Sequence, residues 1–111
     1  MRGHYYSNYV NHMWNLFVSS PDAVPSTANE IDRSDWNICK DVFSGLRTLE
    51  RNLIFARHNP NRSIRESAFR ECYENAGLSE QNASIIISII TDTVAVKRGL
   101  IAPRKTMQQT T

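Results

Sequence analysis

The sequence contains one arrangement that could carry out recognition chemistry, two helical patterns joined by a short glycine-containing turn between Phe69 and Ile90. In a helix-turn-helix, the second helix lies in the major groove of DNA and presents side chains to the base edges. The residues that this spacing places on the outer face of the second helix are Gln81, Asn82, Ser84, Ile85 and Ser88. Glutamine and asparagine pair bidentately with adenine, and serine can bond to any base. The pattern therefore predicts contact with duplex DNA.

Phosphate contacts must come from outside this second helix, because it has no lysine or arginine between Glu80 and Val96. Such contacts supply much of the affinity of a protein for DNA. The nearest candidates are Arg62, Arg65 and Arg70, which lie on or just before the first helix of the motif. The formal net charge is only +2, so an evenly mixed charged surface is the alternative interpretation of these arginines.

No pattern of catalytic or metal-binding residues accompanies the motif. The chain has no glycine-rich phosphate loop, no His-Glu-x-x-His pair and no nucleophile elbow. Cys39 and Cys72 stand 33 positions apart inside apolar helical patterns, which predicts reduced, buried thiols rather than a zinc site. We therefore expect no enzymatic activity, no metal and no cofactor.

The elements that must position the motif are helical throughout. Apolar residues recur at three- and four-residue steps, which predicts an all-α fold of about five helices. The expected divisions are an aromatic N-terminal helix over 1–18, a Pro- and Ser-rich linker over 19–34, a helical body over 35–101 that contains the helix-turn-helix at 69–90, and a flexible tail over 102–111.

Single residues predict where the helices begin and end. Glycine stops a helix and Ser, Thr, Asp or Asn starts one. The expected N-caps are Ser34 or Asp32, Thr48, Ser63 and Ser79, and the expected stops are Gly45, Gly77 and Gly99.

The apolar face of the N-terminal helix is unusually aromatic. Tyr5, Tyr9 and Trp14 are candidates for binding a partner, because an exposed apolar face of this kind marks an interaction site. Packing on the chain's own domain and homodimer formation are the alternatives. No apolar run approaches the roughly 18 residues of a membrane span, and the first residues, MRGHYYSNYV, lack the apolar region of a secretory signal. We therefore expect a cytoplasmic protein without membrane contact.

Several short motifs resemble a known family. The run LRTLERNLIF, followed by a helix and then GLSEQNASIIISII, is similar to the promoter-reading C-terminal domain (region 4) of bacterial sigma factors. The chain also resembles small sigma-like proteins of phages and mobile elements of Gram-positive bacteria, which begin with a YYxxYVxH helix, continue with W-x-x-C-x-x-V and end near RGLI. The matching residues are Tyr5, Tyr6, Tyr9, Val10 and His12, then Trp36, Cys39 and Val42, then Arg98 to Ile101.

The resemblance implies a sigma-like helical fold and a role in transcription regulation. It places Gln81, Asn82, Ser84, Ile85 and Ser88 toward the DNA groove, and Arg65 and Arg70 on the DNA backbone. The alternative hypothesis is a small phage- or mobile-element-encoded protein that binds another protein, either RNA polymerase or a host defence nuclease in the manner of an anti-CRISPR inhibitor. A second helix that is neutral and rich in isoleucine, together with the aromatic first helix, favours this alternative.

Overall fold

The computed structural model describes residues 2–103, and the regular secondary structure of this part of the chain consists of helices alone. The five helices are α1 (Arg2–Ser19), α2 (Glu30–Ser44), α3 (Thr48–Arg57), α4 (Arg62–Asn75) and α5 (Glu80–Arg98). No strand occurs within residues 2–103, so the prediction of an all-α fold with five helices is confirmed. The expected flexible tail lies outside the described residues from position 104 onward.

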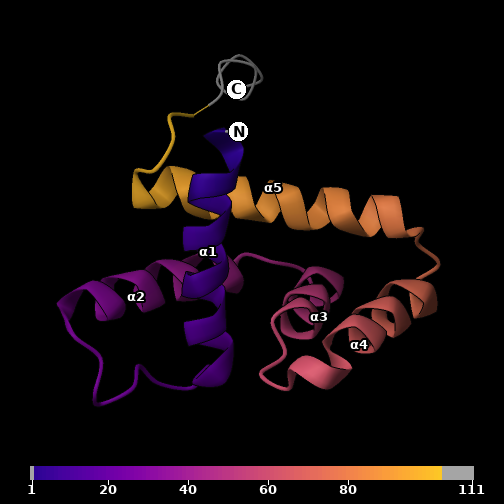
Figure 1. Cartoon of the computed structure of the whole chain (residues 1–111), viewed down its shortest axis with the longest axis horizontal. Coiled ribbons are helices and arrows are strands. Elements are labelled where there is room, and N and C mark those ends of the chain that lie inside the picture. Colours follow the sequence, from indigo (N-terminus) through magenta and orange to yellow (C-terminus); the bar gives the residue numbers. More distant parts are fainter. Residues whose placement is uncertain (1, 104–111) are drawn as a thin grey trace.

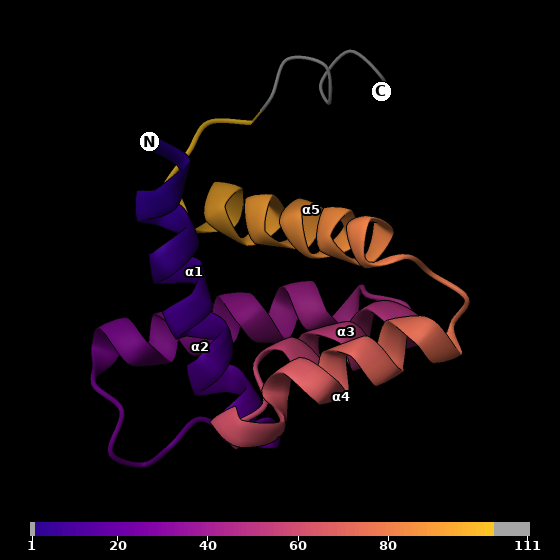
Figure 2. The same cartoon turned by 45° about the vertical axis from the view of Figure 1, so that its right-hand side comes forward.

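The helices form a layered arrangement in which α1 crosses its neighbours (Figures 1 and 2). α1 packs against both α2 and α5, while α3 lies alongside α4 and also contacts α5. α4 and α5 are joined at one end and separate toward the other. Because α1 closes over residues far away in the sequence, the N-terminal helix is part of the same folded body as the C-terminal motif.

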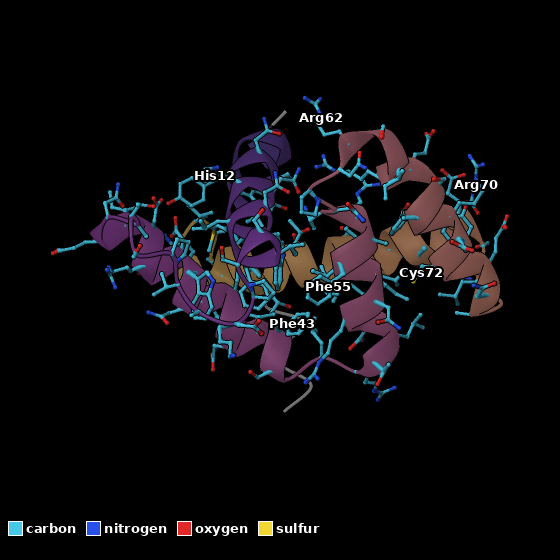
Figure 3. The ribbon with its side chains drawn as sticks, turned by 90° about the horizontal axis from the view of Figure 1, so that it is seen from below. His12, Phe43, Phe55, Arg62, Arg70 and Cys72 are labelled. Carbon is cyan, nitrogen blue, oxygen red and sulfur yellow. The ribbon has the colours of Figure 1, made fainter. Side chains whose placement is uncertain are left out.

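The hydrophobic core takes side chains from all five helices. Trp14 is 0% exposed, and its ring lies edge-on to Phe17 at 5.8 Å and to Phe43 at 6.5 Å. Phe43 in turn meets Phe55 of α3 at 5.3 Å, and both rings lie in the middle of the molecule in Figure 3. The expectation that Trp14 binds a partner is therefore wrong, because burying its large apolar ring within the chain is what holds α1 in place.

The predicted stops at Gly45, Gly77 and Gly99 are confirmed, and Ser79 is confirmed as the N-cap of α5. The predictions for the other three N-caps are wrong, because each predicted residue lies after the one that caps the helix. The observed N-caps are Asn29 for α2, Arg47 for α3 and Asn61 for α4.

Nearby asparagines explain two of these differences. The side chain of Asn29 accepts a bond from the Asp32 backbone N–H at 2.8 Å, so α2 begins at Glu30 and the irregular stretch after α1 ends well before residue 34. Asn61 accepts from both the backbone N–H and the hydroxyl of Ser63, which places Ser63 inside the first turn of α4. An asparagine side chain is at least as good an N-cap as serine, so the earlier residue starts the helix.

Candidate nucleic-acid interface

The turn between α4 and α5 is fixed by backbone hydrogen bonds. The Gly77 N–H donates to the carbonyl of Glu74 at 3.0 Å, and the Leu78 N–H donates to the carbonyl of Tyr73 at 2.9 Å. This pair of bonds requires a left-handed residue, and Gly77 has φ of +74°. Ser79 then starts α5 by accepting a bond from the Asn82 backbone N–H at 3.1 Å. The turn therefore fixes the direction in which α5 leaves the end of α4.

The outer face of α5 carries all five residues that the sequence predicts for base contact. The exposed residues are Gln81, Asn82, Ser84, Ile85 and Ser88. Ile89 is exposed as well, with 61% of its surface accessible, and Ile85 is 56% exposed. Ala83, Ile87, Ile90 and Val94 are buried, whereas Ile86 is only half-buried.

α1 covers one end of α5 and leaves the other open. The Tyr6 hydroxyl of α1 donates to Asp92 Oδ1 at 2.9 Å, in the second half of α5. In Figures 1 and 2, α1 passes α5 near its C-terminal end, and the N-terminal half projects beyond it. The accessible part of α5 therefore lies in its first turns. In a recognition helix, the N-terminal residues are the ones that contact base edges.

A groove of about 520 Å³ lies between α1, the end of α3, α4 and the start of α5. We call it the basic groove, because four arginines line it against two glutamates. Its lining residues are Asn11, Asn15, Arg57, His58, Arg62, Arg65, Glu66, Phe69, Arg70, Tyr73, Glu80 and Ser84. The groove thus brings predicted phosphate-binding arginines of α4 next to Ser84 of the predicted recognition helix.

The four arginines of the basic groove differ in what holds them. Arg65 donates from Nε and Nη2 to the carbonyl of Asn59 at 2.9 and 2.7 Å, and the Arg57 guanidinium lies 5.2 Å from the ring centroid of Phe69. Arg62 and Arg70 are exposed, and neither forms an ion pair with any residue in 2–103. Figure 3 shows both side chains extending outward from α4. Arg62 and Arg70 are therefore open to an anion from solution.

His58 borders the basic groove as a buried, neutral ring. It is 5% exposed, stacks with Trp14 at 6.4 Å, and its Nδ1 lies 3.0 Å from Asn15 Oδ1. Burial, together with the nearby charges of Arg57 and Arg65, lowers the pKa of His58 to about 4. The neutral ring can donate Nδ1–H to the Asn15 oxygen, so His58 contributes a hydrogen bond to the fold and no charge to the groove.

Tyr9, the second residue predicted to bind a partner, is held by its own chain. Its hydroxyl donates to Asp35 Oδ2 at 2.8 Å, and Arg98 donates from Nε to Asp35 Oδ1 at 2.7 Å and from Nη2 to the Tyr9 oxygen at 3.2 Å. Asp35 is 1% exposed. Burial and the bond to Asp35 raise the pKa of Tyr9. This cluster joins α1, α2 and α5, so its role is structural. The Tyr5 side chain lies outside the described side chains.

The structure therefore divides the predicted site residues into two adjoining groups. Arg62, Arg65, Arg70 and Ser84 line the basic groove together. The others, Gln81, Asn82, Ile85 and Ser88, lie on the exposed face of α5. Sequence reasoning missed His58, Asn11 and Asn15 as lining residues, because no local pattern connects α1 with the end of α3.

Other kinds of site find little support in the described part of the chain. Cys39 is buried and Cys72 is partly exposed, both as free thiols, and burial raises the pKa of each. Among residues 2–103, no group of three or more His, Cys, Asp or Glu side chains is placed to hold a metal ion. None of the described helices combines the length and apolar character needed to cross a membrane.

No protein-family model, no curated protein and no solved structure matches this chain.

Proposed function

We propose that the protein is a DNA-binding transcriptional regulator that places the N-terminal half of α5 in the major groove of duplex DNA. The observation that carries this proposal is the position of Arg62 and Arg70. Both are exposed, neither forms an ion pair within residues 2–103, and both line the same groove as Ser84 of α5. In this arrangement the arginines would contact phosphates while the outer face of α5 meets the base edges.

The charge of the basic groove supports this role even though two glutamates lie in it. Glu80 occupies the first turn of α5, where the helix dipole favours a carboxylate, so it serves the helix as well as lowering the groove potential. Glu66 lies on α4 among the arginines. Four guanidinium groups outnumber the two carboxylates, and guanidinium binds phosphate oxygens bidentately. The groove is therefore positive in sum, and arginine is the cation best suited to phosphate.

The proposal is tested by measuring the affinity of the chain for mixed-sequence duplex DNA across a salt series. Each phosphate contact adds about one unit to the slope of log affinity against log salt concentration. We expect Arg62→Gln and Arg70→Gln each to reduce this slope by about 1. The matched control is Arg33→Gln, because Arg33 is also exposed but lies on α2, outside the basic groove.

Three results would contradict the proposal. One is the absence of DNA binding at low salt. Another is an unchanged slope in both groove variants, and the third is an equal loss in the Arg33→Gln control.

A second candidate function is binding and modulating another protein, such as RNA polymerase or a defence nuclease. Ile85 and Ile89 favour it, since both are more than half exposed on a helix face without lysine or arginine until Lys97. The two candidates respond differently to substitution. Replacing Gln81 and Asn82 together by alanine should remove discrimination among DNA sequences, while a protein-binding activity should survive that change and be lost in Ile85→Asp.

A further inference from the structure

We infer that the exposed face of α5 selects A·T base pairs through their major-groove edge, an inference that rests on the proposed function. Charge complementarity favours one orientation, because Arg62 and Arg70 of α4 line the groove that Ser84 of α5 also lines and would meet the phosphates beside this helix. The chemistry of the side chains on the exposed face of α5 then decides which bases are favoured.

The two side-chain amides at the start of α5 are suited to bind adenine. Gln81 and Asn82 are exposed, and among residues 2–103 neither side-chain amide takes part in a hydrogen bond. The bond to Ser79 uses only the backbone N–H of Asn82. An amide carries one acceptor and a donor group, which matches the N6 donor and N7 acceptor of adenine in the major groove.

The two exposed isoleucines of α5 are suited to contact thymine. Ile85 follows Gln81 by one helical turn and Ile89 follows Ile85 by another, so the three side chains occupy one row on the helix. Both isoleucines are more than half exposed. Thymine is the base that presents a methyl group in the major groove, and apolar side chains contact it favourably. The same row therefore offers an amide for adenine and apolar surface for its thymine partner.

Groups that favour G·C pairs are missing from the open part of this face. Arginine and lysine are the common partners of guanine, and α5 has neither before Lys97. A carboxylate could accept a bond from cytosine, but Glu80 lies in the basic groove and Asp92 is bonded to Tyr6. Ser84 and Ser88 are tolerant of any base. The balance of contacts therefore favours A·T.

The open face also limits the size of the site. Residues 81–89 precede the point at which Tyr6 of α1 bonds to Asp92. Eight residue steps of an α-helix extend for about 12 Å, which corresponds to roughly four base pairs at about 3.4 Å each. One chain is thus expected to discriminate over a short run of base pairs.

The test compares the affinity of the full chain for four duplexes of equal length and at one salt concentration. One is A·T-rich, one is G·C-rich, one is the A·T-rich duplex with uracil in place of thymine, and one has inosine in place of guanine in the G·C-rich duplex. Uracil lacks only the methyl group. Inosine lacks the minor-groove amino group of guanine, so this duplex has a G·C-like major groove and an A·T-like minor groove.

We expect the A·T-rich duplex to bind at least about tenfold more tightly than the G·C-rich and inosine duplexes, because each good amide–adenine pair discriminates by about that much. Uracil should weaken binding by about three- to fourfold for each methyl group buried. Ile85→Ala should reduce the difference between thymine and uracil, and Ile85→Ala with Ile89→Ala should abolish it. Ile31→Ala is the matched control, since Ile31 is equally exposed but lies on α2.

Each outcome bears on the inference separately from the proposed function. Equal affinity for the A·T-rich and G·C-rich duplexes would overturn the A·T preference and leave DNA binding in place. Tight binding of the inosine duplex would show recognition from the minor groove. Equal binding of the uracil and thymine duplexes by the unsubstituted chain would remove the role of Ile85 and Ile89. Absence of binding to all four duplexes would overturn the proposed function itself.

Discussion

Acid should destabilise this protein through His58, and the substitution His58→Asn isolates the effect. The pKa of His58 in the folded chain is about 4, compared with 6.5 for an unperturbed histidine. The unfolded chain therefore takes up a proton first as the pH falls. The stabilising contribution of the neutral ring is fully present above pH 6.5 and is lost progressively as the pH falls through that value toward 4.

The size of the effect follows from the difference between the two pKa values. Linkage gives a loss of about 2 kcal/mol by about pH 5 and about 3 kcal/mol at about pH 4, relative to neutral pH. The measurement is the free energy of unfolding in urea at a series of pH values. His58→Asn keeps an N–H donor at the position of Nδ1 for Asn15 but cannot be protonated. Its unfolding free energy should therefore fall less steeply with acid than that of the original chain.

A control and a refuting result complete the design. His12→Asn changes an exposed histidine of α1, which Figure 3 shows on the side of that helix away from Arg62, and it should leave the pH curve close to that of the original chain. Carboxylates contribute equally to all three curves, so only the differences between curves matter. If the original chain and His58→Asn lose stability in parallel between about pH 7 and about pH 5, the burial of a neutral His58 is refuted.

Two further substitutions test the packing and the turn, each by urea unfolding near neutral pH. Arg98→Met should lower the free energy of unfolding by about 3 to 5 kcal/mol, because it leaves the buried carboxylate of Asp35 without its charged partner. Lys97→Met should lower it by less than about 1 kcal/mol, because the ion pair of Lys97 is exposed. Equal losses in the two variants would contradict the burial of Asp35. Gly77→Ala should cost about 1 kcal/mol from the left-handed backbone alone, whereas Gly45→Ala should be close to neutral because its φ is negative.

Much of the fold could be predicted because its signals are local. The number of helices follows from the recurrence of apolar residues, and the stops at Gly77 and Gly99 follow from the left-handed backbone that glycine adopts easily. The starts of the helices were predicted less well. Asn29 and Asn61 and the serines that follow them are all suitable N-caps. A pattern of residue types does not show which of these side chains accepts a bond from the free backbone N–H groups of the first turn.

The site could be predicted only where one helix contains it. The arginines of α4 and the outer face of α5 were identified from spacing within single helices. The contact between His58 and Asn15 joins residues 43 positions apart, and the Asp35–Arg98 pair spans 63 positions. Such contacts depend on how helices cross. For the same reason the sequence does not show whether the aromatic face of α1 packs against its own chain. The structure shows that it does, and Trp14 is buried there.

The packing of α1 narrows the choice between the two proposed functions. Trp14 is buried and Tyr9 is bonded to Asp35, so the described aromatic residues of α1 that suggested a partner surface are engaged within the chain. Of the two surfaces predicted from the sequence, the N-terminal half of α5 is the one that stays exposed, and the basic groove lies beside Ser84 of that helix. A protein partner could use the isoleucines of α5, but it would not require the exposed arginines of the basic groove. Nucleic acid requires both features together, because its phosphates and base edges are bound by different side chains.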